Sequence, residues 1–593
     1  MKKFTLLSLL FIFFFECCVP FGNDNVDPSG DQTEQPSGGN GNSNEDPITQ
    51  PNNEIWYTST DGQIVNPRGT SDYGGVSIVS NTYEDGKGVI TFNGDVTSIG
   101  LNAFQGAETL YSIIIPNSVT SISSYAFKDC TNLTIVDTQD ITSLSIISNV
   151  FEGCVGLTEF RGKAASEDGR CLIFEGVLEL FAPAGLTEYV VPEGVVVVQG
   201  FANCTNLTHV TLPDGVIRIG DFNGCSKLES INIPQSVTMI YEETFSECSS
   251  LKEIVIPEGI VHIPRRLFYN CKSLEKVTIP ESVTSIGQMA FGGCESLKSI
   301  YIPNNITLTD GDDSQIFYGC SGLERFEGNY ASKDGRCLII DGKLVGFASA
   351  RVQQYEVPSE VTSIVSGVFN LCPTLNSLTI PASVQQVGLP IVRFCDNFEA
   401  LYFLSGTPPT SMGPGTNLFD FSPITNNVRA AYVPNLEATY KFRDAFPDMA
   451  EYIFPRGAIL NKIYYTSNTG EIIEPNNYDS LIVSNKYYDD GGVITFNQII
   501  RDIQPQAFFA TTLRSIVIPD SVEWIGHEAF WQCAWLTEIE CRPITPPTID
   551  GLSTFTITDS LDIFVDDEVY DDYVSAYLWG TVWNAFLRST YYY

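Results

Sequence analysis

Histidine and basic residues are scarce in this 593-residue chain. It contains 3 His, and 32 Lys and Arg stand against 71 Asp and Glu, which gives a formal net charge of -39. So few histidines leave little material for histidine-based catalysis or metal binding. The excess of acid argues against nucleic acid as a partner, because a phosphate backbone requires a basic footprint. Charged residues make up only 17% of the chain, so the surface must consist mainly of Ser, Thr, Asn and Gly.

Long apolar runs are missing after the N-terminus. Phe4 to Phe15 is almost wholly apolar behind two lysines, a length too short to span a bilayer but suited to the core of a secretory signal. The run ends at Glu16-Cys17-Cys18, which resembles a bacterial lipoprotein signal, where the acylated Cys becomes the mature N-terminus. We expect Cys18 to be lipidated, because Glu16 fits badly before an acceptor at Cys17. Cys17 as acceptor and plain secretion stay open as alternatives.

The next segment has almost nothing to bury. Residues 22–53 consist mainly of Gly, Asn, Ser, Pro, Asp, Glu and Gln, and such a stretch cannot offset the entropy lost on ordering. We therefore predict a signal peptide over 1–18 and a flexible linker over 19–53. The expected location is the outer membrane, facing the cell exterior, with the lipid as the only contact with the membrane.

Internal repeats dominate the rest of the chain. Phe-x-x-Cys occurs ten times after residue 100, and Leu follows most of these cysteines by three residues. A 23-residue step separates the cysteines of four consecutive units, Cys225, Cys248, Cys271 and Cys294. The same step separates the prolines of those units, Pro234, Pro257, Pro280 and Pro303. A period shared by independent markers indicates a repeat architecture.

One unit shows how a coil of this array should form. Leu274–Pro280 alternates apolar and polar residues with the period of a strand, and its proline ends the strand by removing a ladder donor. Val283 and Ile286 lie on a short extended return, and residues 290–294 form a helical turn that directs Phe and Cys inward. These few apolar groups cannot close a core alone, so we predict that stacked coils share one continuous core.

The repeat pattern carries a resemblance to a known family. Leu-x-x-Ile-x-Ile-Pro-x-x-Val-x-x-Ile-Gly-x-x-Ala-Phe-x-x-Cys, which recurs over about residues 90–545, resembles the BspA-type (Treponema pallidum-like) leucine-rich repeat. The resemblance implies a β-rich leucine-rich-repeat solenoid with a parallel β ladder, short helical turns and a cell-surface location. Some members of that family are adhesins for host matrix proteins or other bacteria. No catalytic residues come with the family.

The array is segmented. Two closely similar segments with Asp-Gly turn sequences predict β-hairpin insertions near 163–185 and 329–350, which we expect to join blocks of coils. A longer duplication and two Thr-Pro-Pro-Thr sequences predict N-terminal and C-terminal caps, because the open ends of a solenoid must be covered. We therefore predict two capped units, 54–455 and 456–593.

The sixteen cysteines are explained by the repeat. One Cys per coil at a fixed position predicts an inward column in which Cys acts as a small hydrophobe. Partial disulfide pairing and a metal site are the alternatives. Zinc sites usually cluster their cysteines, and here only Cys17 and Cys18 are close neighbours. We expect structural thiols.

Two other segments invite a metal hypothesis. His527-Glu528 resembles the start of a zincin motif, but Trp531 stands where the second His is required. Asp310–Ser314 offers oxygen ligands for calcium, although it lacks EF-hand spacing, and a solvated acidic loop is the alternative. With no nucleophile elbow, P-loop or dinucleotide fingerprint visible, we expect no enzyme, no catalytic residue, no metal and no cofactor.

The outward face of the strands is the predicted binding surface. Leucine-rich repeats usually bind through this long and preorganised face. The candidate ligand-binding residues on it are His209, Asn232, Glu253, Lys276, Thr278 and Tyr301. A merely solvated sheet face is the competing interpretation.

These observations predict a non-catalytic cell-surface binding protein, an adhesin that recognises a host matrix protein or another cell. The expected partner is a host or bacterial surface protein. The alternative is a glycan-binding or nutrient-capture lipoprotein, which should use clustered aromatics such as those near Tyr57, Tyr465 or Tyr487-Tyr488.

Overall fold

A computed structural model provides the fold. It describes residues 49–593 with the exception of 69–71, 148, 309–314, 413–416, 420–428, 479, 490, 557–559, 577, 580–586 and 590–593. Cys17, Cys18 and almost all of the predicted linker lie outside the described residues, as does the candidate calcium loop Asp310–Ser314.

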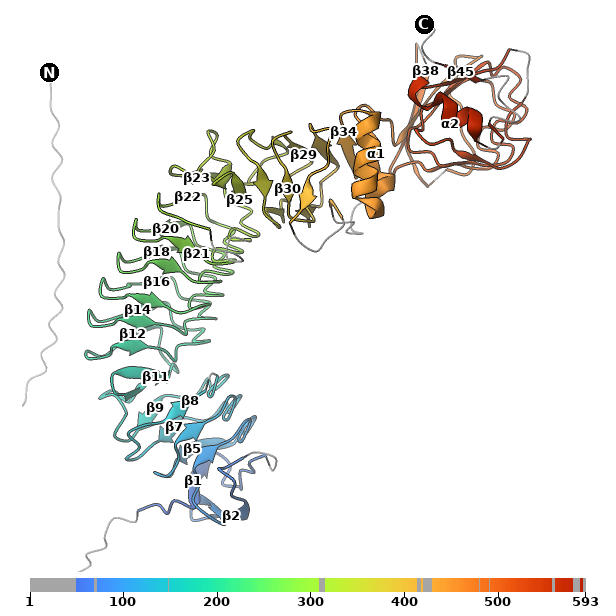
Figure 1. The fold of residues 1–593 in the computed structure, drawn as a ribbon. Helices are drawn as coiled ribbons and strands as arrows, with labels where there is room; N and C mark the ends of the chain where they lie inside the picture. Colours follow the sequence, from blue (N-terminus) through green and yellow to red (C-terminus); the bar gives the residue numbers. More distant parts are fainter. Residues whose placement is uncertain are drawn as a thin grey trace, which may run out of the picture. The chain divides into compact units, whose positions relative to one another are not determined.

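Most repeats contribute two short strands, and both kinds of strand stack in parallel between neighbouring coils. We call the strands that end at the repeat's proline ladder A, exemplified by β12 (Glu188–Val190), β14 (His209–Thr211), β16 (Ser230–Ile231), β18 (Glu253–Val255), β20 (Lys276–Thr278) and β22 (Ser299–Tyr301). The return strands form ladder B, exemplified by β13 (Val197–Val198), β15 (Arg218–Ile219), β17 (Met239–Ile240), β19 (His262–Ile263) and β21 (Ser285–Ile286). Figure 1 shows the ladder A strands in one row along the stacked coils.

The predicted solenoid is therefore confirmed, with one addition. Glu188 pairs with His209 and Glu253 with Lys276 in parallel register along ladder A. The return segment, expected as a short extended stretch, is itself paired, as in the parallel pairing of β15 with β17. The solenoid consequently has two sheet faces, and each presents its own set of outward side chains.

The Phe-x-x-Cys turns close the third side of each coil and fill the core. The rings of Phe222, Phe245 and Phe268 stack with centroids 5.7 and 5.9 Å apart. The Sγ of Cys248 donates to the carbonyl oxygen of Phe222 at 3.2 Å, and the Sγ of Cys271 donates to that of Phe245 at 3.0 Å. The inward cysteine column is confirmed, and all fourteen described cysteines are buried free thiols. Each of these two thiols also forms a hydrogen bond that links its coil to the preceding one.

This burial predicts a loss of stability at high pH. Burial raises the pKa of the thiols of Cys171, Cys320 and Cys337 to about 12, whereas an unfolded thiol titrates near 8.5. Above that value the unfolded chain releases protons that the folded chain keeps, so the free energy of unfolding should fall by up to about 1.4 kcal/mol per pH unit and thiol. The free energy of unfolding, measured with denaturant, should fall between pH 8 and pH 10. The fall should be about 1–2 kcal/mol smaller in Cys320→Ala than in the unchanged protein. An equal drop in both would contradict this assignment.

Two antiparallel hairpins interrupt the parallel array. The first pairs β10 (Cys171–Phe174) with β11 (Val177–Phe181), and the second pairs β24 (Cys337–Ile340) with β25 (Lys343–Phe347). The second strand of each hairpin then pairs in parallel with the next ladder B strand. Each hairpin thus starts a new stretch of ladder B, and the two lie within the segments predicted as insertions.

Two similar antiparallel sheets stand where the duplicated sequences begin. One has β1 (Glu54–Ser59) between β3 (Lys87–Phe92) and β5 (Leu110–Ile114), and the other has β36 (Lys462–Ser467) between β38 (Gly491–Phe496) and β40 (Leu513–Ile518). An edge strand completes each, β2 (Ile78–Glu84) or β37 (Ile482–Tyr488).

Two α-helices were not expected from the repeat pattern: α1 (Leu436–Ala445) and α2 (Tyr570–Ser575). In α1 the Oδ1 of Asn435 accepts a hydrogen bond from the Ala438 amide at 2.9 Å, which satisfies one of the unpaired donors at the helix start. Asn435, which follows a proline and precedes helix-forming residues, is a sequence signal for the start of this helix.

The division at 455/456 stays a prediction, because residues 50–593 form one compact unit. Three large buried clusters follow one another within it, spanning Ile55–Ala182, Cys171–Ile453 and Ile463–Leu587.

A fourth cluster of buried apolar residues lies at the predicted joint. It contains Ala430, Phe454 and Leu460, with Tyr432, Ala458 and Ile499 packed against it. We call the sheet region around β1 the first cap and that around β36 the second cap. Equivalent hydrogen bonds align the two: the Ile500 amide donates to Leu460 O and the Val96 amide donates to Asn52 O, both at 2.9 Å. At the positions of Leu460 and Ile499 the first cap has the polar residues Asn52 and Asp95. The second cap is therefore apolar at the place where it contacts the preceding coils.

A buried carboxylate holds the chain just after the same joint. Asp520 Oδ2 accepts from the Ile459 amide at 2.7 Å and from Arg542 Nε at 2.9 Å. The Asp520 side chain is only 6% exposed. Burial raises the pKa of Asp520 above its ordinary value despite the charge of Arg542.

Candidate functional site

The predicted binding residues all lie on ladder A with exposed side chains. In β14, β18 and β20 the pattern is exposed, buried, exposed, so alternate side chains point away from the core. The structure places the candidates as follows: His209 in β14, Asn232 directly after β16, Glu253 in β18, Lys276 and Thr278 in β20, and Tyr301 in β22.

Two of the six use their polar groups in bonds to neighbouring coils. The side-chain amide of Asn232 accepts from Leu212 N at 2.9 Å and donates to Leu212 O at 3.1 Å. The hydroxyl of Tyr301 donates to Glu281 Oε1 at 2.6 Å. This hydrogen bond lowers the pKa of Glu281 and raises the pKa of Tyr301. Both side chains therefore help to tie coils together.

A third candidate, His209, lies in a polar setting at the surface. Its Nδ1 is 2.9 Å from the hydroxyl of Thr208 and 3.8 Å from Glu188 Oε1. Either ring tautomer can be accommodated there, because the hydroxyl can donate or accept.

The remaining three candidates form the open centre of the face. Glu253 pairs in register with Lys276, and Val255 with Thr278. Val255 is 57% exposed, which adds an apolar contact to the two opposite charges. This patch offers a carboxylate, an ammonium, a hydroxyl and an aliphatic group on a rigid support.

The aromatics suggested for glycan binding are mostly unsuitable, which corrects that expectation. Tyr57 and Tyr465 are 1% and 3% exposed, and their hydroxyls donate to Asn81 and Asn485 inside the two caps. Each lies two positions after a buried Ile of its strand, Ile55 or Ile463, so it points to the same, core-facing side. Tyr488 is exposed.

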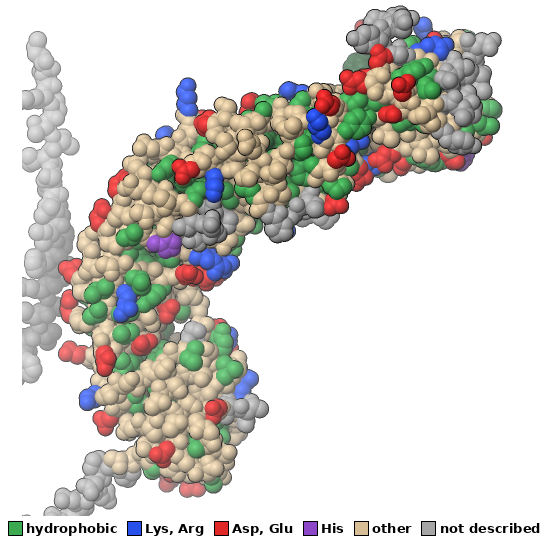
Figure 2. Space-filling view, viewed as in Figure 1, with side chains coloured by type: hydrophobic (Ala, Val, Ile, Leu, Met, Phe, Trp, Pro, Cys, Tyr) green, Lys and Arg blue, Asp and Glu red, His purple; other side chains and the backbone are tan. Residues whose placement is uncertain are grey.

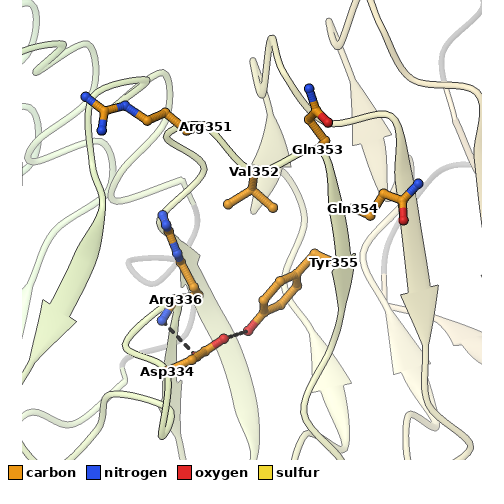
Figure 3. A pocket seen from close by; sticks show the side chains of 7 residues that line it. All are labelled: Asp334, Arg336, Arg351, Val352, Gln353, Gln354 and Tyr355. Carbon is orange, nitrogen blue, oxygen red and sulfur yellow. Dashed lines mark hydrogen bonds between the residues drawn. The ribbon is translucent and has the colours of Figure 1, made fainter.

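Each hairpin carries a polar network, and the network of the second hairpin lies beside an open hollow, shown in Figure 3. Asp334 accepts from the Tyr355 hydroxyl at 3.1 Å and from the Arg336 amide at 3.0 Å. Burial raises the pKa of Asp334, but hydrogen bonds from Ser332, Arg336 and Tyr355 outweigh it and leave the pKa below its ordinary value.

The guanidinium of Arg336 is also engaged by its own hairpin. Its Nη1 donates to the carbonyl oxygens of Ala348 and Ala350 at 3.0 and 3.1 Å. The first hairpin repeats this arrangement with Arg170, Ala182 and Ala184. A network that is duplicated and satisfied within the chain serves as a structural clamp for the hairpin.

Metal ligands do not converge in the part of the chain that the structure describes. There, no group of three or more His, Cys, Asp or Glu side chains is placed to hold an ion. His527 lies beside Asp550, with 3.3 Å between Nδ1 and Oδ2. Over the same residues, no helix combines the length and the apolar character needed to cross a membrane.

Sequence reasoning missed the outward side chains of ladder B. Exposed aliphatic residues recur there on successive coils, whereas the sequence interpretation treated this strand only as a source of core residues. The signal was present, because an aliphatic residue outside the repeat pattern stands at an equivalent place in several units.

This geometry defines a leucine-rich-repeat β-solenoid with two sheet faces. The chain belongs to the BspA-type leucine-rich repeat family. The family model, described as BspA type leucine rich repeat region, matches in 6 copies over residues 81–168, 185–327, 345–416 and 447–564.

Solved structures of bacterial leucine-rich repeat proteins are also similar. A leucine rich cell surface protein from Faecalibacterium prausnitzii is 20% identical, with 80% of this chain and 90% of that chain covered and a TM-score of 0.30. A leucine-rich repeat protein from Bacteroides ovatus is 23% identical, with 64% and 90% covered and a TM-score of 0.34. The pneumococcal vaccine antigen PcpA is 14% identical, with 89% and 97% covered and a TM-score of 0.29. No curated protein matches the chain.

Proposed function

We propose that this protein is a non-catalytic binding protein of the bacterial surface, an adhesin that recognises a host matrix protein or a protein on another cell. The observation that carries the proposal is the open patch of Glu253, Lys276 and Thr278 on ladder A, supported by stacked coils that pair in parallel register. A rigid face lowers the ordering cost of association. Membership of the BspA-type family supports this role.

The proposed attachment is a lipid on Cys18 at the outer membrane. The apolar run before Cys18 and the polar composition of the following residues support it. Mass spectrometry of the mature N-terminus is expected to find an acylated Cys18. An unmodified N-terminus at any residue would contradict the anchor without affecting the binding proposal.

A binding screen of residues 50–593 against matrix proteins and glycans tests the function. We expect a protein partner with a dissociation constant below about 10 μM, which corresponds to about -7 kcal/mol. Because the chain is strongly acidic, a partner with basic patches should bind more weakly as salt is raised from 50 to 500 mM. A response to glycans only, abolished by free sugars, would favour the glycan-binding alternative.

The face itself is tested by reversing its central charges. The double variant Glu253→Lys/Lys276→Glu keeps the net charge. It should lower the affinity for the protein partner at least tenfold, because the charges that face the partner are reversed. Glu471→Lys, an exposed carboxylate on the second cap, is the control and should change affinity by less than twofold. Equal affinity of the double variant and the unchanged protein would move the binding site off ladder A.

A further inference from the structure

Ladder B presents an exposed apolar stripe. Val196, Ile217, Met239 and Val261 are 39%, 43%, 48% and 55% exposed, and they lie on four consecutive coils. Figure 2 shows hydrophobic side chains exposed on the visible face of these middle coils. Soluble proteins rarely leave contiguous large aliphatic groups in water, and such patches commonly mark interaction sites.

Hydrogen bonds join the first three coils of the stripe. The Ile217 amide donates to Val196 O at 2.8 Å, and the Thr238 amide donates to Ile217 O at 2.9 Å. Met239 lies beside Thr238 and is paired in register with Arg218. Val261 occupies the position equivalent to Thr238 on the next coil, 23 residues further on. One exposed apolar side chain therefore lies on each coil.

A column of carboxylates runs beside the stripe on three of its four coils, and Gln235 takes the equivalent position on the coil of Met239. Glu193, Asp214 and Glu258 each follow the proline that ends ladder A, and each precedes a stripe residue by three positions. All three are exposed, and within the described residues none of them forms an ion pair. The next coil continues the column with Glu281, which is bonded to Tyr301.

We propose that this surface binds an amphipathic α-helix of a partner protein, with Lys or Arg along one flank of its apolar face. The apolar stripe would bury the helix's aliphatic side chains, and the carboxylate column would meet its basic flank. This assigns a second face with its own partner chemistry and goes beyond the proposed function, which concerns ladder A.

Spacing favours a helix over an extended peptide. Coils of a β ladder repeat about every 4.7–4.9 Å, and a helix advances about 5.4 Å per turn, so a helix along the array places about one apolar side chain on each coil. An extended strand repeats its outward side chains about every 6.6–6.8 Å and would lose register within two coils. Four coils match a helix of about ten residues.

The test uses a synthetic probe of 18 residues made of leucine and lysine, with the leucines at helical spacing. Fluorescence anisotropy at 150 mM salt measures its binding to residues 50–593. Ile217→Thr/Val261→Thr removes exposed apolar surface but keeps the β-branched shape, and should weaken binding at least tenfold. The matched control is Val79→Thr/Val483→Thr, two valines on the caps that are each 66% exposed, and it should change affinity by less than twofold.

A second pair of variants separates the specific column from the general acidity of the chain. Glu193→Gln/Asp214→Asn/Glu258→Gln should also weaken binding at least tenfold. Glu108→Gln/Glu471→Gln/Asp502→Asn removes the same charge elsewhere and should have less than a twofold effect. The ladder A variant Glu253→Lys/Lys276→Glu should leave probe binding intact, so the two faces can succeed or fail independently.

Three results would overturn the proposal. Absence of binding up to 100 μM would show that the surface does not take a basic amphipathic helix. Equal losses of affinity in the site variants and their controls would show that the probe is held by non-specific charge attraction. Equal binding of a peptide with the same composition but alternating leucine and lysine would exclude the helical occupant.

Discussion

Replacing Phe245 by Ala is expected to lower the free energy of unfolding by about 3–5 kcal/mol. Phe245 is fully buried, and its ring stacks between those of Phe222 and Phe268. Its carbonyl oxygen also accepts the thiol of Cys271. The variant removes contacts to two neighbouring coils at once, and a solenoid cannot redistribute that loss because each coil contacts only its neighbours.

Hydrogen exchange is the suitable measurement for this variant, because a long repeat array need not unfold in one step. Amide protection should fall most in the coils from residue 222 to 291 and change little in 463–587. Phe245→Leu, which preserves much of the apolar volume, should cost clearly less. A uniform loss of protection over the whole chain would contradict a locally coupled array.

The second large effect is expected at the joint. Asp520→Ala removes the acceptor of the Ile459 amide and one of the two carboxylates that bond to Arg542, which keeps Glu540. Breaking a buried pair costs about 3–5 kcal/mol. Because the Arg542 side chain is 34% exposed, we expect a value near the lower end, about 3 kcal/mol. Asp520→Asn should cost less, because burial already disfavours the carboxylate and Asn keeps an oxygen acceptor.

Trypsin provides a local readout of this change. Arg456 is exposed between the two sets of coils, and cleavage after it tracks transient opening of the joint when reclosing is fast. Asp520→Ala should accelerate that cleavage at least tenfold. Asp550→Ala, which removes an exposed carboxylate beside His527, is the control and should leave the rate unchanged. Unchanged cleavage in Asp520→Ala would mean that Asp520 does not hold the joint.

The repeat period, the strand that ends at each proline, and the inward columns of Leu, Phe and Cys could all be predicted from the sequence. These features depend on spacing within one coil. Val277 and Ile279 alternate with Lys276 and Thr278, so any strand built from them buries the first pair and exposes the second. Stacking the coils then does not change which side chains point inward and which point outward.

Which outward groups stay free and which surfaces are covered depends on contacts between coils and could not be predicted from the sequence. Asn232 and Tyr301 look like open polar positions in the sequence, yet each is bonded to a residue 20 positions earlier. The buried state of Asp520 likewise depends on Ile459 and Arg542, which stacking and the joint bring to it. The exposed stripe of ladder B forms because stacking brings aliphatic residues of four coils next to one another. Such properties arise between coils, where the contacts join residues that no local pattern relates.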